Sequence, residues 1–276
     1  MWDQAERDVK CPVSVAAYAC MQRLLASSWR TNFHSPRAPF VAVQLPGYTA
    51  ALNNGTGNYN GSVTAEMVFA MRLQQEAGTA GLDNASFVAT YDQSCALPAP
   101  ACPFGSVHNV QKDVVGARVG ATLHNLLVGG DEVVEGPRAT KASLVTTSAT
   151  GSIASLVGGG SGHWKVAVEF SGGTAPFHTA GTKNCTSCCD ATKDAHTLDF
   201  VATCDGGASW VNGTVTGQVA TASTSNSPAS TLVTFDVPLA TAPTAVRYTA
   251  GAIFPQCALY NAEGLPAIPF EMAVTA

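Results

Sequence analysis

The 276-residue sequence changes character near Gly136-Pro137, and this change constrains the fold more than any other feature. Before this point, short apolar runs alternate with segments of helical periodicity. After it, Thr, Ser, Gly and Val dominate and the helical periodicity disappears. Alternating strands and helices predict a parallel sheet flanked by helices, whereas short strands with frequent turns predict an all-β sandwich. We therefore predict an α/β domain over about 1–130 and a β-sandwich domain over 137–276.

The first part contains two short apolar runs, 40–45 and 87–91, which have the pattern of strands buried on both faces. Helical periodicity predicts helices over 66–77, closed by Gly78, and over 112–128, closed by Gly129-Gly130. Two parallel strands do not make a stable α/β domain. A third strand that begins at Met1-Trp2 would be truncated. We therefore expect a partial parallel sheet flanked by helices.

Two predicted helices carry apolar stripes. Residues spaced by three and four positions predict one stripe on a helix near the N-terminus and an inward face on the helix over 112–128. The first stripe consists of Tyr18, Met21, Leu25 and Trp29, and the second of Val115, Val119, Leu123, Leu126 and Leu127.

The second part contains two runs with the period of two that a half-buried strand requires. The apolar members of these runs are Trp164, Val166, Val168 and Phe170 in the first, and Val233, Phe235 and Val237 in the second.

Composition excludes several classes of function. Hydrophobic residues make up 46% and charged residues 12% of the chain, which is a globular balance. The net charge of −5 gives no bulk attraction for nucleic acid, so we expect no nucleic-acid partner. No apolar run approaches the roughly 20 residues that a membrane helix needs. The oligomeric state is not indicated.

Nine cysteines and five N-x-[ST] sequons favour an oxidising environment, and we expect a lysosomal or secreted protein. The polar N-terminal segment does not have the pattern of a signal peptide. Cys185 and Cys188 have a zinc-ligand spacing, but a second clean pair is absent. We therefore favour disulfides over metal and expect neither a metal ion nor a cofactor. The sequons are at Asn54, Asn60, Asn84, Asn184 and Asn212.

His108 is the candidate catalytic residue. It follows Phe104-Gly105-Ser106-Val107 on a loop directly before the predicted helix over 112–128. Open α/β sheets hold their chemistry beyond the carboxyl ends of the strands, where this loop is expected. A histidine titrates near neutral pH, which suits a general base acting on a serine hydroxyl.

The run FGSVHNVQKDVVGAR resembles the block around the catalytic histidine of sialate O-acetylesterases, in which a lysine and an arginine follow at the positions of Lys112 and Arg118. Further matches occur in the same order as in that family and extend along most of the chain. They are Trp2-Asp3-Gln4-Ala5-Glu6, Cys20, Trp29-Arg30, Phe40 with Val43-Gln44-Leu45, Arg72 with Gln75, Gly136-Pro137, Cys188-Cys189, Arg247-Tyr248, 257–260 and 265–270.

The resemblance implies an SGNH-type hydrolase, with part of a flavodoxin-like parallel sheet, acting on an O-acetylated sialic acid or a related acetylated glycan. In that fold a serine attacks the acetyl ester, a histidine takes its proton, and amides hold the oxyanion. The family's serine lies in a G-Q-S-N-like loop upstream of the segment that Trp2 to Glu6 resembles. The 276 residues contain neither this loop nor a G-x-S-x-G elbow. We therefore expect this chain alone to be inactive.

Other candidate site residues follow from the same comparison. Asp92 matches an aspartate of a family strand and could orient His108, although an Asx turn that caps the loop is the simpler interpretation. Ser106 stands where many SGNH enzymes carry the aspartate that orients the histidine. Gln4, Glu6 and Arg72 are candidates to support the site, although Ala5 replaces a glycine of the family's motif.

A second function is compatible with the sequence. A relative of the esterases that keeps the β domain without the nucleophile can be a non-catalytic glycan-binding or interaction protein. The sequence upstream of Met1 distinguishes the two possibilities, because only the enzyme requires a segment that carries the nucleophilic serine.

Overall fold

The computed structural model has an α/β part followed by an all-β part, as the sequence predicted. By the contacts between its residues the chain divides into two compact units, Met1–Val134 and Glu135–Ala276, which we describe separately. The structure describes residues 15–47, 64–94, 112–145, 162–182, 189, 198–221, 229–252 and 255–276.

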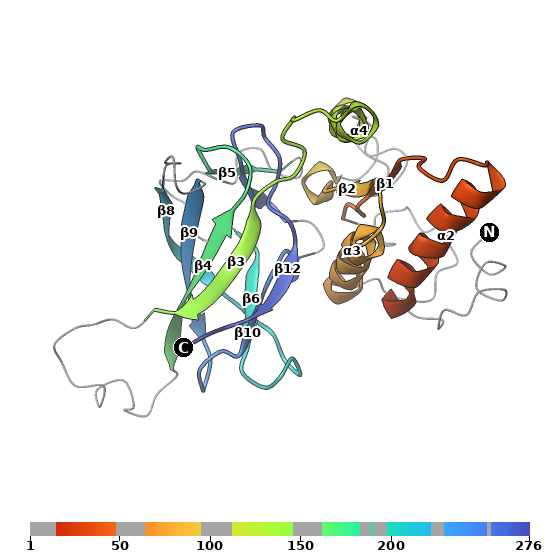
Figure 1. The fold of residues 1–276 in the computed structure, drawn as a ribbon. Coiled ribbons are helices and arrows are strands. Elements are labelled where there is room, and N and C mark those ends of the chain that lie inside the picture. Colours follow the sequence, from red (N-terminus) through yellow and green to blue (C-terminus); the bar gives the residue numbers. More distant parts are fainter. Residues whose placement is uncertain are drawn as a thin grey trace, which may run out of the picture. The chain divides into compact units, whose positions relative to one another are not determined.

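The first unit is built on a small parallel sheet. Strands β1 (Phe40–Val43) and β2 (Ala85–Val88) pair in parallel, with Phe40 opposite Ala85. Helices α3 and α4 both contact these two strands, and α2 lies beside α3 (Figure 1). The helices are α2 (Tyr18–Asn32), α3 (Ala65–Thr79) and α4 (Asp113–Val128), with short 3-10 turns at Val15–Ala17 and Tyr91–Gln93.

Local sequence explains where two of the helices start or stop. The Thr64 side chain accepts a hydrogen bond from the Met67 amide and so caps the first turn of α3. Helix α4 ends at Gly129, which has a φ of 73° in the left-handed region that glycine adopts without strain. Both helices lie within two residues of their predicted bounds at each end.

The buried face of α2 differs from the predicted apolar stripe. Ala19, Gln22 and Ala26 are buried on this helix, whereas Leu25 is 44% and Trp29 is 50% exposed. Small side chains let α2 approach α3 closely, and Gln22 Nε2 donates to the Gln75 carbonyl oxygen at 3.0 Å. A Cβ atom at Gly78 would lie 2.8 Å from that same nitrogen. Close helix packing therefore selects small residues and a glutamine, not the largest apolar side chains.

The inward face of α4 also differs from the prediction. Arg118 and Thr122 are its buried residues, and Leu127, which was expected inside, is 64% exposed. The helix does pack on the two strands, as the sequence indicated. Arg118 makes polar contacts with residues at the end of β2, described below, and these contacts hold this face of α4 against the sheet.

The second unit is an antiparallel sandwich. One four-stranded sheet has the order β3-β4-β9-β8, a second has the order β12-β10-β6-β7, and β11 pairs with β5. The strands are β3 (Arg138–Leu144), β4 (His163–Ser171), β5 (His178–Gly181), β6 (Phe200–Thr203), β7 (Val211–Asn212), β8 (Thr214–Thr221), β9 (Ser230–Pro238), β10 (Ala245–Tyr248), β11 (Cys257–Tyr260) and β12 (Phe270–Ala273).

The predicted alternation produces the core of this sandwich. Val166, Val168 and Phe170 of β4 are fully buried, and so are Val233, Phe235 and Val237 of β9. Aromatic rings from the two sheets meet between them. Phe235 stacks on Phe200 with a centroid distance of 4.8 Å, and Phe170 contacts Tyr248 edge-on at 6.0 Å.

The first and last segments of the second unit are joined. Ser143 of β3 forms a parallel bridge with Thr275, and the Thr275 amide donates to the Ala142 carbonyl oxygen at 2.9 Å. The Ile268 amide donates to the Pro137 carbonyl oxygen at 2.8 Å. A Cβ atom at Gly136 would lie 1.9 Å from the Pro266 carbonyl oxygen, so only glycine fits this contact. The unit is therefore closed by pairing between its two ends.

In the part of the chain that the structure describes, none of the helices has the length and the apolar character needed to cross a bilayer.

Candidate functional site

The candidate site is the carboxyl edge of the small parallel sheet in the first unit. Because β1 and β2 are parallel, the residues that follow Val43 and Val88 emerge at the same edge. The Thr90 hydroxyl donates a short hydrogen bond to the Gln44 carbonyl oxygen and ties the two strand ends together. Five residues on the β2 side of this edge, Val88 to Asp92, are buried without interruption.

Gln75 of α3 completes the outer edge of the chain that follows β1. Its side-chain amide accepts from the Leu45 amide at 2.6 Å and donates to the Val43 carbonyl oxygen at 3.1 Å. A neighbouring strand would make the same two bonds, so Gln75 takes the place of a strand residue.

Arg72, one turn before Gln75 on α3, is fully buried at the same edge. Its Nε donates to the Leu45 carbonyl oxygen at 2.9 Å, and Gln44 Nε2 donates to the Arg72 carbonyl oxygen at 3.2 Å. The guanidinium carbon lies 5.6 Å from the centre of the buried Tyr91 ring, within the range of a cation–π contact. The structure thus places Arg72 at the predicted sheet edge, where it fixes the backbone after β1 and the ring after β2.

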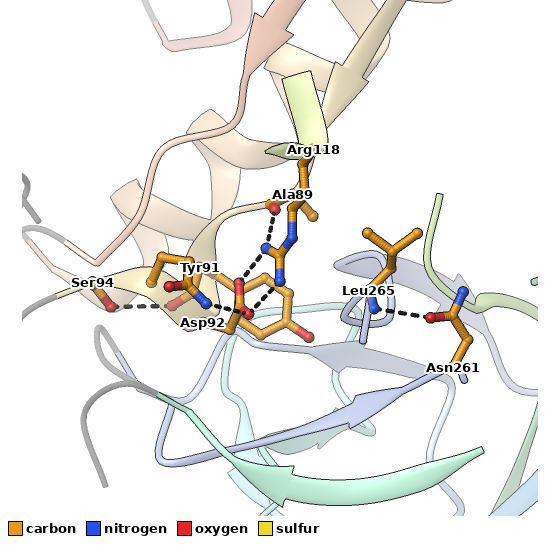
Figure 2. Close-up of polar contacts among 8 residues, drawn as sticks. Ala89, Tyr91, Asp92, Ser94, Arg118, Asn261 and Leu265 are labelled. Atoms are coloured by element: carbon orange, nitrogen blue, oxygen red, sulfur yellow. Dashed lines mark hydrogen bonds and ion pairs between the residues drawn. The ribbon is translucent and has the colours of Figure 1, made fainter. Parts of the chain in front are cut away.

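Asp92 forms a buried ion pair with Arg118 of α4 (Figure 2). Arg118 donates from Nη1 to Oδ1 and from Nη2 to Oδ2 of Asp92, both at 2.8 Å, and from Nη1 to the Ala89 carbonyl oxygen at 2.8 Å. Gln93 Nε2 donates to Asp92 Oδ2 at 2.8 Å as well. This two-bond geometry is the strongest form of an arginine–carboxylate contact.

The Asp92–Arg118 pair was not predicted. The sequence suggested that Asp92 either orients His108 or caps the loop through an Asx turn, and the described residues test neither possibility. The sequence nevertheless contains a signal for this pair. Within Val114–Val128, Arg118 and His124 are the only residues whose side chains can carry a charge, and most of the others are small or apolar. Burying an arginine is costly unless its charge is paired or its donors are hydrogen-bonded, so this position favours an acidic or carbonyl partner.

The remaining candidates lie outside the described residues. His108 and Ser106 belong to the segment 95–111, and Gln4 and Glu6 belong to the segment 1–14. The segment with His108 joins Ser94, at the carboxyl edge of the sheet, to Lys112, which precedes α4.

The second unit contains a carboxylate with a shifted pKa. Asp205, in the turn after β6, accepts hydrogen bonds from the Ser209 hydroxyl at 2.5 Å, the Thr203 hydroxyl at 2.6 Å and the Ser209 amide at 3.0 Å. These bonds, the Ser209 hydroxyl first, lower the pKa of Asp205 far below its ordinary value. The donors lie within four residues of Asp205, so local hydrogen bonds of this turn account for the lowered pKa.

A disulfide joins Cys189 to Cys257 of β11, with a Cα–Cα distance of 5.8 Å, and Cys20 of α2 is also disulfide-bonded. Cys204 is a free thiol. The predicted preference for disulfides over zinc thus holds for Cys189. Among the described ranges, no three His, Cys, Asp or Glu side chains form a group that could hold a metal ion.

Comparison with known proteins gives a likeness of fold. No family model matches the sequence, and no curated protein matches it. Among solved structures, the chain is similar to a carbohydrate acetylesterase from Xanthomonas citri, with a TM-score of 0.60 and 18% sequence identity. The match covers 95% of this chain but 47% of the esterase chain, so this chain spans about half the length of that protein. The order of an α/β part and a β-rich part is therefore shared with a carbohydrate acetylesterase.

Proposed function

We propose that this chain is the histidine-bearing part of a carbohydrate esterase that removes O-acetyl groups from sialic acid or a related glycan. The observation that carries the proposal is the agreement in fold, over 95% of this chain, with a carbohydrate acetylesterase. The motif resemblance supports the finer assignment to sialic acid and names His108 as the base. The nucleophilic serine would come from polypeptide outside these 276 residues.

The described residues support a site at the carboxyl edge of the sheet. Residues on both flanks of the segment 95–111 are held there, Asp92 and Ser94 before it and Arg118 after it. Ser94 donates from its hydroxyl to the Tyr91 carbonyl oxygen at 3.0 Å and is fully buried. The described residues on both sides of the segment with His108 thus lie at the edge where open α/β sheets bind their substrates.

The proposed reaction follows the serine esterase scheme. The serine oxygen attacks the acetyl carbonyl carbon while His108 takes the hydroxyl proton. His108 then protonates the glycan oxygen as the ester bond breaks, which leaves an acetylated serine. Water attacks this second ester with His108 again as the base, His108 returns the proton to the serine oxygen as the ester bond breaks, and acetate leaves.

The experiment compares two proteins in acetate release from an O-acetylated sialic acid and from an aryl acetate. The 276-residue chain is expected to give no rate above a buffer and imidazole background. A protein extended by the segment with the serine is expected to be active. In the extended protein, His108→Ala is expected to lower kcat by about 10²–10⁴-fold, which is the usual contribution of a general base.

His124→Ala is the matched control, because His124 is a half-exposed histidine on the helix that follows the proposed site. It is expected to keep the activity. Activity of the 276-residue chain with sensitivity to a fluorophosphonate would contradict the proposal and point to a serine within it, such as Ser106. An extended protein that binds O-acetylated sialic acid without hydrolysing it would favour the glycan-binding alternative.

We also propose an oxidising location, either lysosomal or secreted. The disulfide between Cys189 and Cys257 and the exposed sequon at Asn212 support it. Enzymatic removal of N-glycans from the protein made in its own cells is expected to lower its mass. Unmodified asparagine at all five sequons together with reduced cysteines would contradict this location.

A further inference from the structure

Two neighbouring residues of α4 hold the chain that leaves this helix. Asn125 Nδ2 donates to the Glu132 carbonyl oxygen at 2.7 Å, and Asn125 Oδ1 accepts from the Glu132 amide at 3.3 Å. The Glu132 backbone is therefore bonded twice to one side chain, as it would be to a residue of a neighbouring strand. The preceding residue, His124, has its Nδ1 atom 3.3 Å from the Glu132 carboxylate oxygen Oε1.

Glycine at position 130 leaves room for this arrangement. A Cβ atom there would lie 2.6 Å from Asn125 Oδ1 and 2.8 Å from His124 Nδ1, so both side chains lie against Gly130. Gly129, with its φ of 73°, turns the chain at the end of α4 and lets Glu132 return beside the helix. His124, Asn125, Gly130 and Glu132 thus form one compact group, which we call the clasp.

The clasp acts on the connection between the two units, which meet between Val134 and Glu135. Within the second unit, the Glu135 carbonyl oxygen accepts from Asn261 Nδ2 at 3.4 Å. When the clasp is closed, residues 133–134 alone separate it from Glu135. When it is open, the free stretch extends over 130–134, and its greatest length rises from about 7 Å to about 17 Å.

The charge on His124 depends on pH. A histidine gains its proton as pH falls through about 6.5, whereas a glutamate loses its charge only below about pH 4.3. Attraction between His124 and Glu132 is therefore present between these limits and is lost as pH rises. The two side chains are 53% and 50% exposed, so solvent screens the pair, and it adds to the Asn125 bonds without replacing them.

The other charges around His124 are few among the residues that the structure describes. Strands β1 and β2, on which α4 packs, carry no charged side chain. On α4 itself, Arg118 is engaged in the buried ion pair described above, and Asp113 lies about three turns away. Asp131 gives the connection a second negative charge. The charges of the connection therefore complement a protonated histidine.

We propose that the clasp is a pH-dependent restraint on the connection between the two units. The two Asn125 bonds form it at neutral pH, and the ion pair of protonated His124 with Glu132 tightens it in mildly acidic surroundings. A closed clasp shortens the free chain between the units, so the β-rich unit is tethered more tightly at acidic pH. The clasp takes no part in the chemistry proposed for His108, so either proposal can fail without the other.

Hydrogen exchange at the Glu132 amide tests the clasp, because this amide donates to Asn125. The full chain is measured at about pH 5.5 and about pH 8, on either side of the histidine titration. Each rate is divided by the intrinsic rate of the same unfolded sequence at that pH. We expect the corrected rate to be about two- to five-fold lower at the acidic pH, the range that an exposed ion pair supports. His124→Ala and Glu132→Gln are each expected to remove this difference.

Two further variants separate charge from structure. His124→Lys keeps a positive charge at both pH values and is expected to keep the slow rate at both. Gly130→Ala displaces the two side chains and is expected to raise the rate at both. His163→Ala changes an exposed histidine of β4 and, as the control, should leave the pH difference intact. Equal corrected rates at the two pH values in the unaltered chain, or a difference that survives His124→Ala, would overturn the proposal.

The tether is tested on the same proteins. Amide order parameters of residues 130–132 report motion of the connection on the picosecond to nanosecond timescale. They are expected to be higher at the acidic pH and to fall in Gly130→Ala at both pH values. Order parameters that are as low in the unaltered chain as in Gly130→Ala would show that the connection is free chain, which contradicts a closed clasp.

Discussion

Arg118 donates a hydrogen bond to each carboxylate oxygen of Asp92 (Figure 2). In the sequence, Asp92 precedes the segment 95–111 and Arg118 follows it. Their side chains are 7% and 1% exposed. The pair joins the end of β2 to α4 directly. The residues that precede and follow the segment with His108 are therefore joined by this buried ion pair.

Arg118→Met is expected to lower the free energy of unfolding by about 3–5 kcal/mol, because it leaves the Asp92 carboxylate buried without its cation. Guanidinium unfolding of the full chain measures the change. The double variant Asp92→Leu with Arg118→Met is expected to recover most of it, since it removes both buried charges. Arg138→Met, which breaks an exposed pair with Glu135, is the control and is expected to change stability by at most about 1 kcal/mol.

Gln75→Leu is expected to expose the Leu45 amide to exchange. The substitution removes the acceptor for that amide and the donor to the Val43 carbonyl; both bonds are partly buried, so each lost partner costs at most about 1–3 kcal/mol. Hydrogen exchange followed residue by residue gives the result. Gln74→Leu changes the neighbouring residue in the same way and should leave Leu45 protected; equal loss in both variants would contradict the role of Gln75.

Reduction of the Cys189–Cys257 disulfide is expected to destabilise the β-rich unit by about 2–4 kcal/mol. Cys257 is fully buried in β11, so the bond restrains a core strand. Thermal unfolding with and without reductant measures the effect, and Cys189→Ser should reproduce it under oxidising conditions. Cys204→Ser alters a free thiol and should leave the transition unchanged. A reductant effect that persists undiminished in Cys189→Ser would assign the stabilisation to another disulfide.

The pKa of Asp205 is expected to lie below the ordinary aspartate value of about 3.9 in a carboxyl-resolved NMR titration. Because folding depresses this pKa, the stabilisation is complete above the unfolded value and is lost as pH falls through the folded value. Ser209→Ala removes the largest cause and should raise the pKa most, with a smaller rise for Thr203→Val. An ordinary titration of Asp205 in the unaltered protein would contradict this account.

Periodicity in the sequence was sufficient to predict several of the elements. The strands around Phe40 and Phe87, the helices α3 and α4, and the buried alternation of β4 and β9 follow from local patterns of apolar residues. Residues that favour turns indicated where helices end, as Gly129 does for α4. The division into an α/β part and an all-β part followed from the same signals.

Periodicity did not predict which helix face is buried. The burial of Ala19 and Gln22 in place of Leu25 depends on the close approach of α3 at Gly78, which is a contact between distant parts of the sequence. The pairing of Asp92 with Arg118 is long-range in the same sense. At the candidate site, the family resemblance identified Arg72 and Asp92 as candidates. Their contact partners could not be predicted, because those contacts join residues that are distant in the sequence. His108 stays a prediction.

The pairing of Ser143 with Thr275 has a consequence for biosynthesis. Thr275 Oγ1 donates to the Ala142 carbonyl oxygen across 133 positions, so the strand that opens the β-rich unit bonds to residues made at its far end. Contacts of this separation form late and slowly. The sandwich cannot close on the ribosome until residue 275 has been synthesised, and during that interval β3 offers an unprotected edge to other nascent chains.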